Sequence, residues 1–112
     1  TAGKEVYKNG NVYCASKYAV NALNKAMRID LNKHNIRVAA IHPGAVETEF
    51  SAVRFKGDIE RAKKVYDGFE PLIAQDIAEA IWFALSRPAH VTINDMVIMP
   101  TAQANTSHLL KK

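Results

Sequence analysis

The fold class follows from one short segment, residues 36–44, which read Ile36-Arg37-Val38-Ala39-Ala40-Ile41-His42-Pro43-Gly44. Residues 36–41 form a nearly continuous apolar run with β-branched side chains, which is typical of a buried parallel strand. His42-Pro43-Gly44 then ends the strand, because proline has no N–H for a sheet ladder and glycine permits a sharp exit. A buried parallel strand needs helices on both faces of its sheet, so the segment predicts an α/β protein.

Helices are predicted on both sides of this strand. Before it, a stripe of small and apolar residues has a 3.6-residue period, and Asn35 is placed to end the helix in a left-handed conformation. This stripe comprises Ala15, Ala19, Ala22, Leu23, Ala26 and Met27. After the strand, residues 74–85 predict a second amphipathic helix that Pro88 ends. Its expected buried stripe comprises Ile77, Ala80, Ile81, Ala84 and Leu85.

Between the strand and the second long helix, residues 45–57 show no clean period, and we expect a mobile lid there. Asp58 can cap a short helix that runs to about Tyr66. Residues 95–100 predict a second strand. Two strands do not make a stable parallel sheet with both faces covered, and the chain begins Thr1-Ala2-Gly3 without a methionine. We therefore expect residues 1–112 to be the C-terminal part of one longer α/β domain.

Composition excludes several classes of protein. The 112 residues are 48% hydrophobic and 23% charged, with a net charge of +4 and one cysteine, Cys14, that suits a small buried position. Lysines and arginines are scattered among acidic residues, which argues against a nucleic-acid partner. No apolar run approaches the ~20 residues of a membrane span, so we expect a cytoplasmic protein without a membrane partner. The four histidines lack the spacing of a zinc site, and no metal is expected.

Tyr13 and Lys17 stand four residues apart where the first helix begins. Residues at i and i+4 share a helix face, so the ammonium can lie beside the phenol. A phenol ionises near pH ~10, and a fixed positive charge favours the phenolate, which suits acid and base work near neutral pH. A half-buried tyrosine beside a solvated lysine would show the same spacing, so other motifs must distinguish the two interpretations.

A second candidate site follows the first strand, in Pro43-Gly44-Ala45-Val46-Glu47-Thr48. Open α/β sheets bind ligands at the carboxyl ends of their strands. The amide and carbonyl of Val46 can pair with a carboxamide, and the Thr48 hydroxyl can bind an amide or a phosphate. A plain turn between strand and loop is the alternative.

Taken in order along the chain, these motifs resemble the short-chain dehydrogenase/reductase family. The resemblance rests on Asn11-Val12-Tyr13-x-Ala15-Ser16-Lys17, followed by a long helix, a short strand and Pro43-Gly44-x-Val46-x-Thr48. Within the family, Glu49-Phe50-Ser51-x-Val53-Arg54-Phe55-Lys56-Gly57-Asp58 and Asn94-Asp95-x-x-Ile98-Met99-Pro100-Thr101 are most similar to NADP-dependent 3-hydroxy acid (serine-type) dehydrogenases. The resemblance implies the C-terminal half of a Rossmann-type doubly wound sheet.

The resemblance also implies roles for single residues. Tyr13 would be the catalytic acid and base, and Lys17 would favour its ionised form and hydrogen-bond the nicotinamide ribose. The cofactor, NADP with NAD as the alternative, would be lined by Pro43, Gly44, Ala45, Val46, Glu47, Thr48, Glu49 and Phe50. Val46 and Thr48 would be the polar anchors, and the two glutamates would face solvent. The family's serine would stand just before Thr1, and its Gly-rich turn is absent from the sequence.

The substrate and the assembly are further expectations. A small 3-hydroxy acid carries a carboxylate, and Arg54 is the nearest candidate cation, although a solvent-facing arginine is the alternative. A reductase of 3-oxoacyl thioesters is the competing activity. In this family the helix that carries the tyrosine and lysine often joins subunits, so we expect a homo-oligomer, with a tetramer favoured. A non-catalytic helical assembly module is the alternative if the fragment acts alone.

Overall fold

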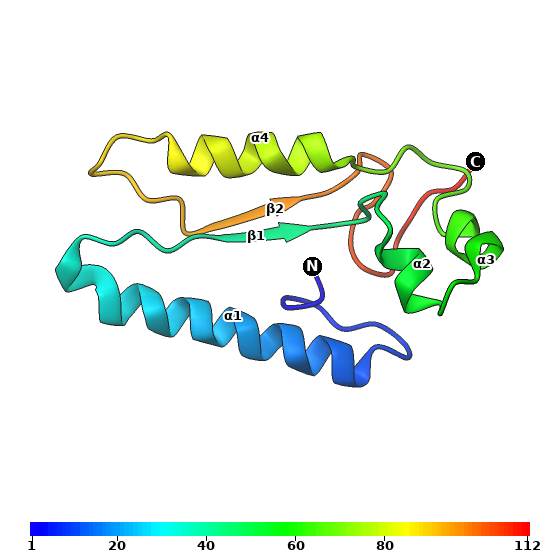
Figure 1. The fold of residues 1–112 in the computed structure, drawn as a ribbon, viewed down its shortest axis with the longest axis horizontal. Helices are drawn as coiled ribbons and strands as arrows, with labels where there is room; N and C mark the ends of the chain where they lie inside the picture. Colours follow the sequence, from blue (N-terminus) through cyan, green and yellow to red (C-terminus); the bar gives the residue numbers. More distant parts are fainter.

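The computed structural model describes residues 1–112, apart from the side chain of Arg54. The elements are α1 (Asn11–Leu31), a 3-10 turn (Asn32–His34), β1 (Ala40–Pro43), α2 (Phe50–Arg54), α3 (Ile59–Lys64), α4 (Ala74–Leu85) and β2 (Asp95–Ile98). Figure 1 shows α1 on one side of the two strands and α4 on the other, with α2 and α3 beyond the carboxyl end of β1. The α/β class predicted from the sequence is therefore confirmed.

The two strands are parallel, with Ala40 opposite Asp95 and Pro43 opposite Ile98. The prediction of a strand over residues 36–41 was wrong by several residues, because pairing starts at Ala40 and includes Pro43. Proline is tolerated here because alternate peptide groups face alternate edges of a strand. The N–H of Gly44 donates to the carbonyl of Ile98 at 2.7 Å, so the missing N–H of Pro43 falls on the edge away from β2.

The small and apolar stripe of α1 lies on the exposed side of the helix. Ala15, Ala19, Ala22, Leu23, Ala26 and Met27 are all exposed. Polar side chains face the segments that lead into β1 and β2 instead, because they satisfy backbone carbonyls there. Arg28 donates to the carbonyls of Val38 and Asn94 at 3.0 and 2.7 Å, and Asn24 donates to the carbonyl of Ala39 at 2.9 Å. Asn35 has φ 56° and ends the turn after α1, as predicted. In the described chain no helix combines the length and apolarity needed to cross a membrane.

Helix α4 has the bounds that the sequence predicted. Its inner side carries Ile77, Ala80 and Ala84, whereas Ile81 and Leu85 are exposed, contrary to the prediction. Only a narrow side of this helix contacts the sheet, because two strands cover less than a full helix face.

The guanidinium of Arg37 ties the end of α4 to the segment before β1. It donates to the carbonyls of Leu85, Arg87 and Val91, each at 3.0 Å. These carbonyls lie at or beyond the end of α4, where backbone acceptors have no partner within the helix. Side-chain donors thus replace the hydrogen bonds that the helix end lacks.

The segment after β1 is more regular than expected, since residues 45–57 include α2. Helix α3 begins where predicted, because the Asp58 carboxylate accepts a hydrogen bond from the N–H of Arg61 at 3.0 Å. This helix ends at Lys64, two residues before Tyr66. Both short helices follow the loop in which most of the predicted cofactor-binding residues lie.

Candidate active site

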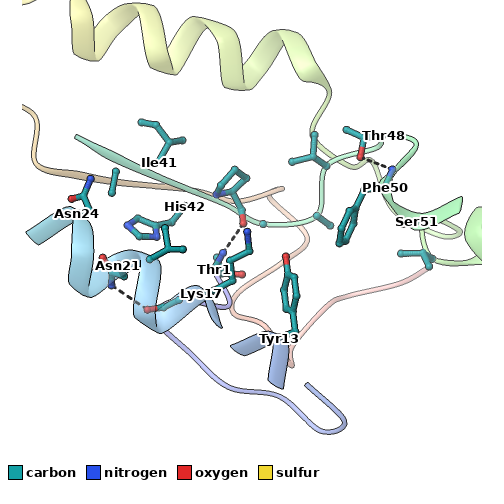
Figure 2. Close-up of a pocket in the computed structure, with 18 of the residues that line it drawn as sticks. Thr1, Tyr13, Lys17, Asn21, Asn24, Ile41, His42, Thr48, Phe50 and Ser51 are labelled. Carbon is teal, nitrogen blue, oxygen red and sulfur yellow. Dashed lines mark hydrogen bonds between the residues drawn. The ribbon is translucent and has the colours of Figure 1, made fainter. Parts of the chain in front are cut away.

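Tyr13 lies in the first turn of α1, and Lys17 follows one turn later. The Lys17 Nζ atom lies 5.5 Å from the centroid of the Tyr13 ring. The Tyr13 ring also contacts Phe50, with ring centroids 6.2 Å apart and ring planes inclined by 38°. Figure 2 shows the Tyr13 hydroxyl directed toward the loop that follows β1. The side chain is held by neighbours yet remains 37% exposed, so a ligand can reach it.

The loop after β1 remains extended and pairs with the residues before α4. The N–H of Glu47 donates to the carbonyl of Leu72 at 2.8 Å, and the N–H of Leu72 donates to the carbonyl of Ala45 at 3.0 Å. Peptide groups alternate in direction along an extended chain, so the N–H and carbonyl of Val46 point away from Leu72. Among the described residues the Val46 N–H has no acceptor. It is therefore available to a ligand.

Thr48 offers a second donor in the same loop. Its hydroxyl oxygen accepts a hydrogen bond from the N–H of Phe50 at 3.3 Å, the contact drawn as a dashed line in Figure 2. A hydroxyl has one hydrogen and two lone pairs, so this contact leaves the O–H free to donate. The exposed hydroxyl can therefore bind an amide or phosphate oxygen.

These groups meet in a cleft of about 580 Å³ that runs along β1 and past its carboxyl end. Its lining includes Tyr13, Lys17, Pro43, Gly44, Ala45, Val46, Thr48 and Phe50 from the predicted set. Glu47 and Glu49 are exposed and do not line it. The predicted substrate ligand Arg54 has its side chain outside the described residues. The volume lies within the ~300–1,000 Å³ range of small-molecule sites.

A polar cluster near the cleft was missed at the level of sequence. Buried His42 donates from Nε2 to Asp95 Oδ1 at 2.8 Å, and the Lys4 Nζ lies 3.8 Å from the same oxygen. The hydrogen bond from His42 lowers the pKa of Asp95 below its usual 3.8, and the charge of Lys4 acts in the same direction, although partial burial opposes both. Only the strand register brings these residues together. In the described part of the chain, no three His, Cys, Asp or Glu side chains gather as a metal site would require.

Tyr66 is a second residue that sequence reasoning missed as part of the site. Its hydroxyl donates to the carbonyl of Val46 at 2.8 Å, and the Ser51 hydroxyl lies 2.9 Å from the same phenol oxygen. Tyr66 and Ser51 both line the cleft. No spacing motif marks them, because the contact depends on how two short helices pack.

Sequence comparison assigns the chain to a family. The model described as short chain dehydrogenase matches residues 1–58, which is more than half of the chain. An uncharacterized oxidoreductase of Mycobacterium tuberculosis is 49% identical over 106 residues, covering 95% of this chain and 42% of that protein. An NADP-dependent 3-hydroxy acid dehydrogenase of Schizosaccharomyces pombe is 44% identical over 111 residues, covering 99% of this chain and 43% of that protein. The chain therefore belongs to the short-chain dehydrogenase family.

Structural comparison agrees with this assignment. The closed form of a serine dehydrogenase complexed with NADP+ has a TM-score of 0.91 and 42% sequence identity, and the match covers 100% of this chain and 46% of that one. A serine dehydrogenase from Escherichia coli has a TM-score of 0.70 and 33% identity. The chain thus spans less than half the length of these relatives. The predicted family resemblance and the Rossmann-type fold class are both confirmed.

Proposed function

We propose that residues 1–112 are the C-terminal part of one short-chain dehydrogenase/reductase domain. We further propose that the whole protein is an NADP-dependent oxidoreductase that interconverts a small 3-hydroxy acid and its carbonyl. One observation carries this proposal: a phenol and an ammonium on one face of α1 share a cleft with the unbonded N–H of Val46, as far as the described residues show, and with the hydroxyl of Thr48. The names of the relatives, an NADP-dependent 3-hydroxy acid dehydrogenase and a serine dehydrogenase, support the choice of cofactor and substrate class.

In the proposed reaction Tyr13 is the catalytic acid and base. During reduction its hydroxyl gives a proton to the carbonyl oxygen while the carbonyl carbon receives a hydride. During oxidation the phenolate takes the proton of the alcohol while the carbon loses a hydride. NADP, when bound, supplies or accepts that hydride. The ammonium of Lys17 stabilises the negative charge on the phenolate, because the two groups lie on one helix face in a partly enclosed cleft.

The residues of the cleft fit the nicotinamide end of such a cofactor. Among the described residues the Val46 N–H lacks an acceptor, and the O–H of Thr48 is free to donate, so two donors are available to the oxygen of a carboxamide or a phosphate. In this proposal Lys17 would hydrogen-bond the ribose of the bound cofactor. The sequence contains no Gly-x-Gly-x-x-Gly turn, so we expect the adenine half to be bound outside these 112 residues.

Arg54 remains our candidate for the carboxylate of a 3-hydroxy acid. It is the last residue of α2, the helix that begins at Phe50 beside the Tyr13 ring. A guanidinium binds a carboxylate with two parallel hydrogen bonds, which a neutral side chain cannot replace. In the whole protein, Arg54→Leu should raise KM for the acid substrate while leaving the Kd of NADP+ unchanged. A proportional rise in both constants would contradict this role.

The activity is tested by measuring nucleotide-dependent turnover in the whole protein. Serine and 3-hydroxypropionate would be compared as alcohols with NADP+ and with NAD+, and a 3-oxoacyl thioester would be tested with NADPH. Preference for the thioester would favour the competing reductase activity, and absence of turnover with all three would contradict the proposal. Residues 1–112 alone should show no turnover, and measurable turnover would contradict the need for the remaining elements.

The outer face of α1 supports a second proposal, that the protein is a homo-oligomer, with a tetramer favoured. Its small residues Ala15, Ala19, Ala22 and Ala26 are all exposed and allow close approach of another helix. Sizing of the whole protein at micromolar concentration tests this. A monomer would contradict the proposal, and replacing Ala19 by Glu should shift an oligomer toward smaller species without changing α1.

A further inference from the structure

The Tyr66 hydroxyl makes a contact that the reaction proposed above does not use. Tyr66 follows α3, yet its phenol reaches the loop after β1 and donates to the Val46 carbonyl at 2.8 Å. Its single hydrogen is committed to that carbonyl, so the Ser51 hydroxyl, 2.9 Å away, donates to the phenol oxygen. Ser51 is only 7% exposed. A buried serine on α2 and a tyrosine after α3 thus form a directed chain that ends on the Val46 carbonyl.

The backbone on both sides of Val46 is held at two edges. On one edge, the neighbouring Ala45 carbonyl and Glu47 N–H are bonded to Leu72. On the other edge, the Val46 carbonyl is held by Tyr66, while the Val46 N–H has no acceptor in the described chain. A carbonyl oxygen has two lone pairs, so it can accept from Tyr66 and from a second donor. A carboxamide presents a carbonyl acceptor and an NH2 donor, and the N–H and carbonyl of Val46, which point to the same edge of the extended chain, are the complementary pair.

We propose that Tyr66 is a positioning residue that holds the Val46 carbonyl, and with it the neighbouring N–H of Val46, in the orientation that binds the carboxamide of the nicotinamide cofactor. This inference rests on the proposed function, because it presumes a nicotinamide in the cleft. Since Ser51 belongs to α2 and Tyr66 follows α3, the same chain of hydrogen bonds links the two short helices to cofactor binding. Preorganisation of this kind improves affinity because the loop does not have to be ordered on binding.

The experiment compares Tyr66→Phe with Tyr18→Phe in the whole protein. Both changes delete one phenol oxygen, but Tyr18 donates to the Lys4 carbonyl at 2.7 Å and does not line the cleft. Binding is measured by titration with NADP+ and with its 3-acetylpyridine analogue, in which a methyl ketone replaces the carboxamide and removes its N–H donor. Tyr66→Phe should weaken NADP+ binding by about three- to tenfold, the size of one neutral hydrogen bond. Binding of the analogue should change much less, and Tyr18→Phe should change neither.

A second measurement needs no cofactor. Amide hydrogen exchange should be faster at Glu47 in Tyr66→Phe, because its N–H belongs to the loop that Tyr66 holds. Exchange at Ala40, whose N–H donates to Asn94 at 3.0 Å in the sheet, should stay unchanged. Ser51→Ala should produce a smaller effect in the same direction, because it removes only the second link.

Each outcome has a definite meaning. An equal loss of affinity for both nucleotides, or no loss for either, would overturn the positioning role. Unchanged exchange at Glu47 in Tyr66→Phe would overturn the claim that Tyr66 holds the loop. Failure of the wild-type protein to bind NADP+ would instead overturn the proposed function, so the two failures are distinguishable.

Discussion

The two ends of β1 use polar groups in opposite ways. At the amino end, the side chains of Arg28 and Asn24 donate hydrogen bonds to backbone carbonyls. Arg37 does the same at the end of α4. At the carboxyl end, the Val46 N–H and the Thr48 O–H keep their capacity to donate. Polar groups that are satisfied within the chain hold the fold together, whereas those left with free capacity in a cleft are available to ligands. Mutations at the two ends should therefore affect different measurements.

The largest effect is expected from Tyr13→Phe at the carboxyl end. Loss of the hydroxyl removes the proton donor, so kcat should fall by about 10²- to 10⁴-fold, the range for general acid–base catalysis. The Kd of NADP+ and the thermal midpoint should stay close to wild type. Tyr18→Phe is the matched control, and an equal loss of kcat in the two variants would contradict a catalytic role for Tyr13.

Lys17→Met should reduce kcat/KM by about 10²-fold, since it removes the charge that stabilises the phenolate. Lys17→Arg keeps the charge and should recover part of the activity, but not all, because the guanidinium has a different shape. Lys25→Met on the exposed side of α1 is the control for loss of a lysine. Full activity in Lys17→Met would show that the ammonium beside Tyr13 has no part in the reaction.

Arg28→Met should destabilise the protein by about 2 kcal/mol, because the charged donors to the Val38 and Asn94 carbonyls are lost. Urea unfolding measures this change, with Lys25→Met as the control on the same helix. The kcat per folded molecule should be unchanged. A large loss of kcat at constant stability would contradict the claim that the amino end of β1 serves stability and the carboxyl end serves ligand binding.

Thr48→Val is expected to weaken NADP+ binding by about three- to tenfold through loss of one donor. Its effect on stability should be small, because the side chain is exposed. Thr101→Val, at another exposed position, is the control. Equal affinity for NADP+ in Thr48→Val and in the wild type would contradict a role for Thr48 in cofactor binding.

Asp95→Asn should have the smallest effect, and its size should depend on pH. His42 lowers the pKa of folded Asp95 below 3.8, so this carboxylate stabilises the protein above that pH and loses its contribution as pH falls through the folded pKa. The variant should be less stable at pH 7 by about 0.5–1 kcal/mol, typical of a partly exposed pair, and the gap should narrow once the pH falls below 3.8. Asparagine still accepts a hydrogen bond, so the substitution isolates the charge. A gap that is the same at pH 7 and below pH 3.8, measured by urea unfolding, would contradict the role of the ionised carboxylate.

Local patterns predicted those features that depend on neighbouring residues. The bounds of α4, the Asp58 cap and the left-handed Asn35 were correct, because periodicity and caps are local properties. The periodicity also predicted α1, but it did not show which side of this helix faces the rest of the chain. Alanine and leucine indicate burial on average, but here Asn24 and Arg28 face the segments that lead into the strands because nearby carbonyls need donors.

The sequence by itself determined the α/β order, the pair Tyr13 and Lys17 on one helix face, and the Pro-Gly turn at a strand end. Each of these depends on the spacing of residues close in sequence, and the periods of a helix and a strand fix where such residues lie. Only the tertiary structure decided that His42 meets Asp95, that Leu72 pairs beside Val46, and that Tyr66 reaches the Val46 carbonyl. These contacts join segments up to 53 residues apart, and strand register and helix packing place them.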